Sequence, residues 1–332
     1  MHKFQRWCSA LCGAIAAAAA LLAQAQAQTQ LRLAHHHAVG GTVDLTANKF
    51  AELVAEKSKG KLIVKVFPAA QLGQEREAYG LVNTGVLDLS ITSLAILDQV
   101  YPPINVTSLP FVFRDWQHVF KLYDGDFGAT LRDGIKQNTN TQLFGYIHLG
   151  FRDMLFRGSA VKDAAGMKGL KMRAPEAALW FKMFESLGAK PTPVTWGEVY
   201  SAMQTGVADG LESPVMASLD MKFNEVTKSL VRTHHMFGSM GVFGSNAKLG
   251  RLSKEQIGIL EAAGKQATEW SNKTISEPGE QEAYKKLADL GVEVADPAKI
   301  EEWSTPMKPM WMELTTKTPG SDRLLKMILE TK

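Results

Sequence analysis

Two stretches of this sequence repeat one another and decide the fold: residues 77–88 read EAYGLVNTGVLD, and residues 198–209 read EVYSAMQTGVAD. Six of the twelve aligned positions are identical, and the copies lie 121 residues apart, too far for a solenoid period. Each copy has the pattern of a short helix, a glycine and a strand, over 89–92 after the first copy and 210–212 after the second. Chance similarity of a common pattern is one interpretation. The other, which we adopt, is two similar lobes that face a shared cleft.

The residues before the first copy alternate between strand and helix periods. Residues 31–34 (LRLA) and 62–67 (LIVKVF) have the composition of strands. Between them, four apolar residues share one face of a helix: Val43, Ala47, Phe50 and Val54. Strand, helix and strand at this spacing favour an α/β fold with parallel pairing. Ligands bind outside the carboxyl ends of such strands, which here are Thr92-Ser93 and Ser213-Pro214.

A second lobe is predicted to begin near Gly150. An apolar strand is expected over 143–149, and a further strand over 167–175. The tail from Ser253 is helical, with a late strand over 290–294. No stretch rich in Pro, Gly or Ser separates the two parts, so we expect the chain to cross between the lobes several times, as in a hinged clam.

The N-terminus has the order of a secretory signal peptide, which we assign to residues 1–27. Two basic residues precede an uncharged apolar run of 13 residues over 11–23, whereas a bilayer span needs about 20. Small-x-small sites follow, and we expect cleavage after Ala25 or Ala27 and release into the periplasm. The alternative is a buried helix of the mature fold.

Composition narrows the classes of function. Both cysteines, Cys8 and Cys12, lie in the signal segment, so the mature protein is expected to have no disulfide, thiolate nucleophile or cysteine metal site. The chain has 37 Lys and Arg against 34 Asp and Glu and no long basic run, so no nucleic acid is an expected partner. Roughly 305 mature residues are enough for two domains.

Arg173 is the first candidate for ligand binding. It closes the predicted strand before Ala174-Pro175, so its side chain is expected at a strand end. A guanidinium offers a planar fork that matches a carboxylate with two parallel hydrogen bonds. The alternative is an ordinary surface arginine that pairs with a nearby acid. Arg152, placed just after the strand that ends near Gly150, is a weaker candidate of the same kind.

The remaining candidates carry less weight. Trp196 follows Pro193-Val194-Thr195, where it either walls a pocket or caps the core. Ser93 and Ser213 stand at strand ends, where serines usually satisfy backbone groups. Three adjacent histidines, His35 to His37, point to alternate faces of an extended chain, so they are not expected to form one metal site, although one can face a cleft. The same caution applies to His234-His235.

No catalytic pattern is present in the sequence. We find no Gly-x-Ser-x-Gly elbow, no His-Glu-x-x-His helix and no phosphate-binding glycine loop. We therefore expect neither an enzyme nor a cofactor.

Several motifs, in order along the chain, resemble the solute-binding proteins of TRAP (tripartite ATP-independent periplasmic) transporters, dicarboxylate-binding type. They are SKGK (58–61), FPAAQLG (67–73), KGLKMR (168–173) and WGEVYSAMQTGVADG (196–210). The resemblance covers essentially the whole mature chain. It implies a two-lobe, Venus-flytrap fold with hinge-crossing strands and a long bridging helix. Lobe I would hold residues 28–149 and 239–278, and lobe II 150–238 and 279–332.

The resemblance also implies a function. The protein would receive a small organic acid and deliver it to a two-component membrane permease that is driven by an ion gradient, and we expect it to act as a monomer. Arg173 falls on the family arginine that clamps the substrate carboxylate, and Arg152 on a second pocket arginine. Ser213 takes a place often held by asparagine, which puts one contact in doubt. Other pocket-lining positions fall on His36, Ser93, Trp196 and His235.

The sequence leaves the acid open. Two arginines suit one carboxylate with a neighbouring oxo or hydroxy oxygen, or two carboxylates. A hydroxy acid, a sugar acid and an oxo acid all remain candidates. Two other classes are also considered, namely a binding protein for an ATP-driven importer and a secreted enzyme.

Overall fold

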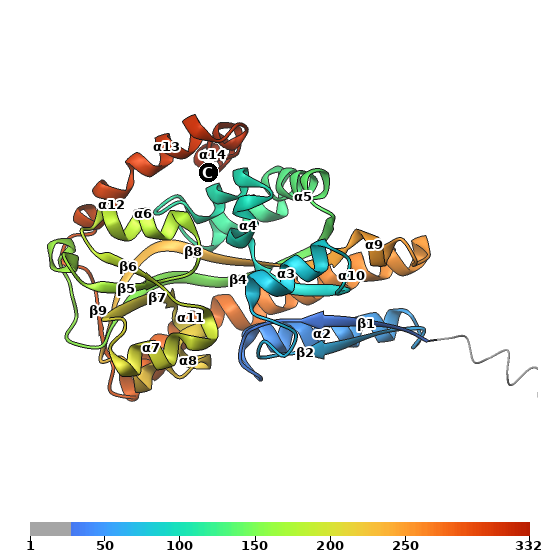
Figure 1. Cartoon of the computed structure of the whole chain (residues 1–332), viewed down its shortest axis with the longest axis horizontal. Coiled ribbons are helices and arrows are strands. Elements are labelled where there is room, and N and C mark those ends of the chain that lie inside the picture. The colour runs from blue at the N-terminus through green and yellow to red at the C-terminus, as the bar shows by residue number, and fades with distance from the viewer. Residues whose placement is uncertain (1–27) are drawn as a thin grey trace, which may run out of the picture.

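The computed structural model describes residues 28–332 as a mixed α/β fold built on one nine-stranded sheet. The strands follow the order β2-β1-β3-β8-β4-β7-β5-β6, and β9 pairs with β8 (Figure 1). The signal peptide predicted over 1–27 lies outside the described residues. Within 28–332, no helix is both long and apolar enough to cross a membrane.

One end of the sheet is formed by β1 (Thr29–Ala34), β2 (Leu62–Phe67) and β3 (Leu89–Ser93), which run parallel. The helix α2 (Thr42–Lys57) lies between β1 and β2 in sequence, and α3 (Glu75–Asn83) precedes β3. All four residues of the predicted helix face are buried in α2: Val43, Ala47, Phe50 and Val54. They pack on apolar residues of β1, β2 and β3, so the predicted first α/β unit is confirmed.

The other end repeats this arrangement. It contains β5 (Lys171–Ala174), β6 (Lys190–Pro193) and β7 (Gly210–Pro214), with α6 (Ala178–Ser186) and α7 (Val199–Thr205). The order β2-β1-β3 at one end is matched by β6-β5-β7 at the other, with parallel pairing in both. The helix–glycine–strand reading of both sequence copies is therefore confirmed.

The identical aspartates of the repeat perform the same structural task. A carboxylate oxygen of Asp88 accepts the backbone N–H of Arg32 at 2.9 Å, and one of Asp209 accepts the backbone N–H of Lys171, also at 2.9 Å. Asp88, just before β3, thereby binds the neighbouring strand β1, and Asp209, just before β7, binds the neighbouring strand β5. Their identity in the two copies follows from this backbone contact.

Two long strands run through the middle of the sheet. They are β4 (Thr141–Phe156) and β8 (Ser229–Ser245), which pair antiparallel to each other. The prediction that a strand ends at Leu149 is wrong, because β4 continues through Gly150. That residue has a φ of 98° and lies at a shift in the β4–β8 register, so it marks a bulge and not an end.

Two other strand predictions also need correction. The strand expected over 167–175 is only β5, because η3 (Ala164–Met167) is a 3-10 turn and Gly169 lies in the left-handed region. The late strand expected over 290–294 is the shorter β9 (Glu293–Ala295).

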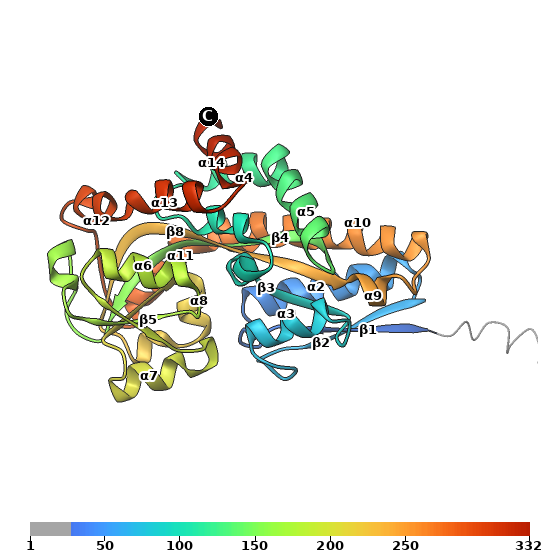
Figure 2. The ribbon, with the colours of Figure 1, turned by 45° about the horizontal axis from the view of Figure 1, so that its top comes forward.

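A long helical run joins the two ends of the molecule. It consists of α10 (Lys254–Ser271), a π-helical turn (Asn272–Ser276) and α11 (Glu277–Asp289). Pro278, near the start of α11, has no N–H to donate to the preceding turn, which accounts for the local change in pitch. The run passes from α2 and β4 at one end to α8 (Val215–Asp220) at the other (Figures 1 and 2). The two-lobe fold with a bridging helix is confirmed.

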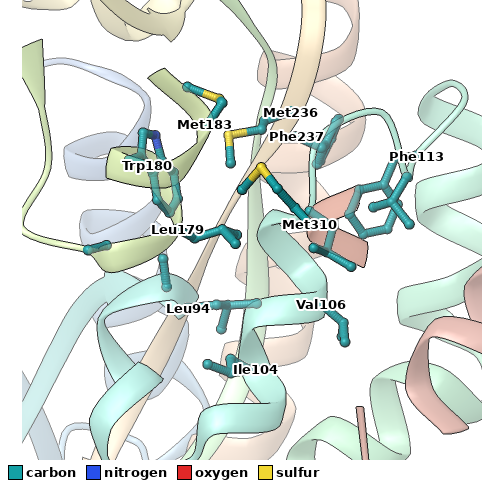
Figure 3. Packing of buried hydrophobic residues seen from close by; sticks show 14 of the residues in the cluster. Leu94, Ile104, Val106, Phe113, Leu179, Trp180, Met183, Met236, Phe237 and Met310 are labelled. Atoms are coloured by element: carbon teal, nitrogen blue, oxygen red, sulfur yellow. The ribbon is translucent and has the colours of Figure 1, made fainter. Parts of the chain in front are cut away.

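The last helices lie across the top of the molecule in Figure 1. They are α12 (Ile300–Met307), α13 (Pro309–Lys317) and α14 (Ser321–Glu330). The helix α12 contacts α6, whereas α14 contacts α5 (Asp126–Asn138) and the 3-10 segment η2 (Pro102–Ser108). Met310 packs in one apolar cluster with Leu94 and Ile104 from one half and Leu179 and Met183 from the other (Figure 3).

The remaining helical segments complete the connections. They are η1 (Leu94–Gln99), α4 (Trp116–Asp124), η4 (Trp196–Glu198), η5 (Phe223–Glu225) and α9 (Asn246–Leu249).

Candidate functional site

A cavity of about 230 Å³ lies at the carboxyl ends of the parallel strands of both halves. His36 follows β1, Ser93 ends β3, Arg173 is the third residue of β5, and Pro214 ends β7. The strand ends that the sequence indicated as the ligand site therefore do surround a shared cavity. Its middle is closed by the central strands, through Leu149 and Arg152 of β4 and 238–240 of β8.

Five of the seven predicted binding residues line this cavity: Arg173, Arg152, Trp196, His36 and Ser93. Two do not. Ser213 is fully buried and its hydroxyl donates to the backbone carbonyl of Pro214 at 3.1 Å, so Pro214 faces the cavity in its place. His235 is also fully buried, and its Nδ1 is 2.8 Å from the hydroxyl of Thr233.

Arg173 is buried, with 3% of its surface exposed, which rules out the surface arginine considered above. Its Nε donates to the carbonyl of Val194 at 3.0 Å, and its Cζ lies 5.4 Å from the centre of the Trp196 ring. No other hydrogen bond or ion pair engages its side chain within residues 28–332, so both terminal nitrogens are available to a ligand. Burial lowers the pKa of Arg173 to about 10, which leaves it cationic at neutral pH.

Arg152 has a different environment. It lies inside β4, and not after the end of a strand as expected, because the strand continues to Phe156. Its Nε and Nη2 donate to the two carboxylate oxygens of Glu212 in β7, the second at 2.7 Å. Its charge is therefore matched before any ligand arrives.

Glu212 is a site residue that the sequence reasoning missed. Its carboxylate is fully buried and also accepts the indole N–H of Trp180 at 2.8 Å. Burial favours the neutral acid, but the Arg152 guanidinium outweighs it and holds the pKa of Glu212 well below its usual range. The available signal was a charged residue inside the buried strand Gly210–Pro214.

The opposite wall of the cavity carries Glu75, which was also missed. One carboxylate oxygen accepts the backbone N–H of Ser93 at 2.5 Å, and the other lies 3.8 Å from Nε2 of His36. The Ser93 hydroxyl accepts the N–H of Ala95 at 3.2 Å and caps η1, the structural role usual for a serine at a strand end.

The three adjacent histidines divide between two environments. His35 is buried against Asp44, 3.1 Å away, whereas His36 and His37 both line the cavity, with ring centres 4.6 Å apart. Burial lowers the pKa of all three, so they are neutral at neutral pH. Within the described part of the chain, no group of three His, Cys, Asp or Glu side chains is arranged to hold a metal ion.

Trp196 both walls the cavity and packs on the core, the two roles that the sequence allowed. It lines the cavity beside Arg173 and His37, and its ring packs edge-on against Phe223 in the core, with centres 5.3 Å apart.

Contacts across the cleft hold the two halves together. The backbone N–H of Thr42 donates to the carboxylate of Asp220 at 3.1 Å, and Arg76 donates to the carbonyl of Glu176 at 2.9 Å. These contacts join α2 to the end of α8, and α3 to the segment after β5. The two halves are therefore in direct contact beside the cavity, which Arg76 and Glu176 both line.

Comparisons with known proteins agree with this architecture. The family model described as "Bacterial extracellular solute-binding protein, family 7" matches residues 33–318. The 2,3-diketo-L-gulonate-binding periplasmic protein YiaO of Escherichia coli is 28% identical over 303 residues, which cover 91% of this chain and 92% of YiaO.

Solved structures are similar over nearly the full length. A TRAP periplasmic solute-binding protein from Sulfitobacter, with bound β-D-galacturonate, has a TM-score of 0.86 and 29% identity, covering 90% of this chain and 99% of its own. Another from Sulfurospirillum deleyianum, with bound succinate, has a TM-score of 0.86 and 26% identity, covering 92% of this chain and 100% of its own.

Proposed function

Because this chain belongs to family 7 of the bacterial extracellular solute-binding proteins, we propose that its cleft captures a small organic acid for delivery to a TRAP membrane permease. It is a receptor and not an enzyme. Similar proteins bind galacturonate and succinate, both of which carry carboxylates.

The observation that carries this proposal is the free guanidinium of Arg173. A buried cation without an anionic partner is costly, and a ligand carboxylate removes that cost. The planar fork of its two unengaged nitrogens fits the two oxygens of a carboxylate. Direct contacts are also assigned to Arg152, Trp196 and His36. Ser93 acts through Glu75, and Ser213 and His235 support the wall from behind.

The lobe boundaries follow from the same proposal. Lobe I comprises residues 28–149 and 239–278, and lobe II comprises 150–238 and 279–332. The ligand then contacts both lobes, since His36 and Arg173 come from opposite ends of the sheet. Ligand binding stabilises the closed form because only that form brings both walls to the ligand.

Thermal-shift screening against a library of organic acids tests the receptor function. An acid present at about 100 times its Kd stabilises the fold by about 2.7 kcal/mol, a clear rise in Tm. Arg173→Ala serves as the matched control, since it should fold and lose the response. A library of mono- and dicarboxylic acids that leaves Tm unchanged contradicts the proposal.

Transport is tested by reconstitution. Vesicles that contain the membrane subunits encoded beside this protein should take up the identified acid only when the protein and an ion gradient are both supplied. Uptake that requires ATP hydrolysis instead assigns the protein to an ATP-driven importer.

Export and assembly complete the proposal. The protein is secreted to the periplasm with cleavage before Gln26 or Gln28 and acts as a monomer. Intact-mass measurement and light scattering on protein recovered from the periplasm check both points. Retention of Met1 contradicts the first, and a stable dimer contradicts the second.

A further inference from the structure

The charges around the cavity limit the kind of acid that it accepts. Six charged side chains line it, and a seventh pairs directly with the wall. Arg76, Arg152, Arg173, Glu75, Glu77 and Glu176 line the cavity, and Glu212 pairs with Arg152. Arg152 and Glu212 cancel one another in a bidentate pair inside the wall. Arg173 is then the one cation in this set that is free to meet a ligand, and Glu75 is an anion on the other side.

The other groups at the cavity add no unpaired cation, and Glu77 and Glu176 are further acids in its lining. His36 and His37 are buried and neutral. Arg76 at the rim is paired with Asp98, with both of its terminal nitrogens 3.2 Å from the same carboxylate oxygen. A second ligand carboxylate would therefore meet Glu75 or a cation that is already matched, at a cost in desolvation and repulsion.

We infer that Glu212 makes this cleft selective for acids with a single carboxylate and an uncharged, hydroxylated remainder. The inference rests on the proposed function and narrows it. Glu212 acts by neutralising Arg152, so it sets specificity without touching the ligand. The Glu75 oxygen that faces His36 engages no hydrogen-bond donor within residues 28–332, and a ligand hydroxyl supplies one.

The size of the cavity is consistent with this class. Its volume of about 230 Å³ is below the range of about 300–1,000 Å³ for drug-sized ligands. Short-chain hydroxy acids and single sugar acids are of suitable size.

The test uses pairs of acids that differ only in the second carboxylate. Suitable pairs are glycerate with tartronate, erythronate with meso-tartrate, and gluconate with glucarate, measured by calorimetric titration. The monoacid of each pair that binds should bind at least about tenfold more tightly than its diacid. Diacids that bind as tightly as their monoacids, or more tightly, overturn the inference but leave the receptor function intact. If no member of the pairs and no acid of the library binds, the proposed function fails instead.

Two variants connect the preference to Glu212. Glu212→Gln keeps the shape of the side chain and a hydrogen-bond acceptor for Trp180, but it leaves the charge of Arg152 unpaired. The affinity for the diacid should therefore rise about tenfold relative to the affinity for the monoacid. Asp296→Asn is the matched control, because it removes an equal charge from a pair with Arg232 that does not line the cavity, and it should leave the ratio unchanged. An unchanged ratio in folded Glu212→Gln overturns the assignment. If Glu212→Gln does not fold, Glu75→Gln replaces it. Removing the anion on the facing wall should likewise lower the ratio of monoacid affinity to diacid affinity.

Discussion

Arg173 combines two properties that rarely occur together, nearly complete burial and two unengaged guanidinium nitrogens. Removing its charge leaves a ligand carboxylate buried without a partner, which typically costs about 3–5 kcal/mol. Arg173→Ala should therefore weaken binding about a hundredfold or more. Arg173→Lys should restore only part of the affinity, since an ammonium lacks the paired donors. Calorimetric titration measures both, and a folded Arg173→Ala that keeps its affinity within about threefold removes Arg173 from the site.

His148 provides a pH-dependent contribution to stability. It lies among aromatic rings, with Nδ1 3.1 Å from the Ser239 hydroxyl, and burial lowers its pKa to about 3 from the ordinary histidine value of 6.5. Between pH 6.5 and about pH 3, His148 is protonated in the unfolded chain but stays neutral in the folded protein. Stability present above pH 6.5 is therefore lost as the pH falls, by up to about 1.4 kcal/mol per pH unit.

Replacing His148 by glutamine should remove this contribution. Urea unfolding between pH 4 and 8 should show a smaller fall in the unfolding free energy of His148→Gln than of the unaltered protein on the acid side. The difference between the two proteins at pH 8, where a free histidine is neutral, gives the baseline. Parallel curves over the whole range contradict the assignment.

Individual residues were partly predictable. Arg173 was identifiable as a candidate because it closes a predicted strand, and ligands bind outside the carboxyl ends of such strands. Glu212 was not singled out, because the sequence does not show that Arg152 of β4 lies beside it in a neighbouring strand. His235 was assigned to the pocket from the family resemblance, whereas a bulged stretch of β8 turns it into the protein interior.

At the scale of elements, the glycine in each repeat copy has a definite task. Gly85 and Gly206 have φ values of 81° and 80°, and each ends the helix before the next strand. An alanine in this left-handed region costs about 1–2 kcal/mol. At Gly85 its Cβ would also lie only 3.0 Å from that of Ala247.

Gly85→Ala should therefore destabilise the fold by about 1–2 kcal/mol in urea unfolding. Gly80, five residues earlier and inside α3, offers the matched control, since an added Cβ there meets no atom within 4 Å. Gly80→Ala should be stabilising by up to about 1 kcal/mol. Equal effects of the two substitutions would show that backbone conformation is not the cause.

Helices and strands were predicted best where the local sequence pattern agrees with the pairing and burial that distant residues impose. The helix α2 has an apolar face with a regular period, and that face is buried as expected. In β4 the signals conflict, because Gly150 looks like a break while the strand is continued by pairing with β8 and β7. That pairing is contributed by residues far away in sequence, so a local reading ends the strand too early.

At the scale of the whole molecule, the structure has the two halves in contact around the cleft. Ligand-driven closure predicts that the protein without ligand is more expanded and becomes compact when an acid binds. Small-angle scattering with and without saturating ligand should show a decrease in the radius of gyration. Arg173→Ala at the same acid concentration should show none. An unchanged radius for the unaltered protein counts against closure by a hinge.

The matching registers of the two halves also fix how a ligand is oriented. Aligning the repeat through Asp88 and Asp209 makes Ala34 of β1 the counterpart of Arg173 in β5. The two registers match, yet Arg173 lines the cavity whereas Ala34 packs in an apolar cluster with Ala78 and Val82, so only one side of the cavity receives a cation from this position. An acid that entered back to front would place its anionic head against the wall that carries Glu75 and the neutral His36 and His37. Under the proposed function, every molecule therefore lies the same way round, and the permease receives it with a single polarity.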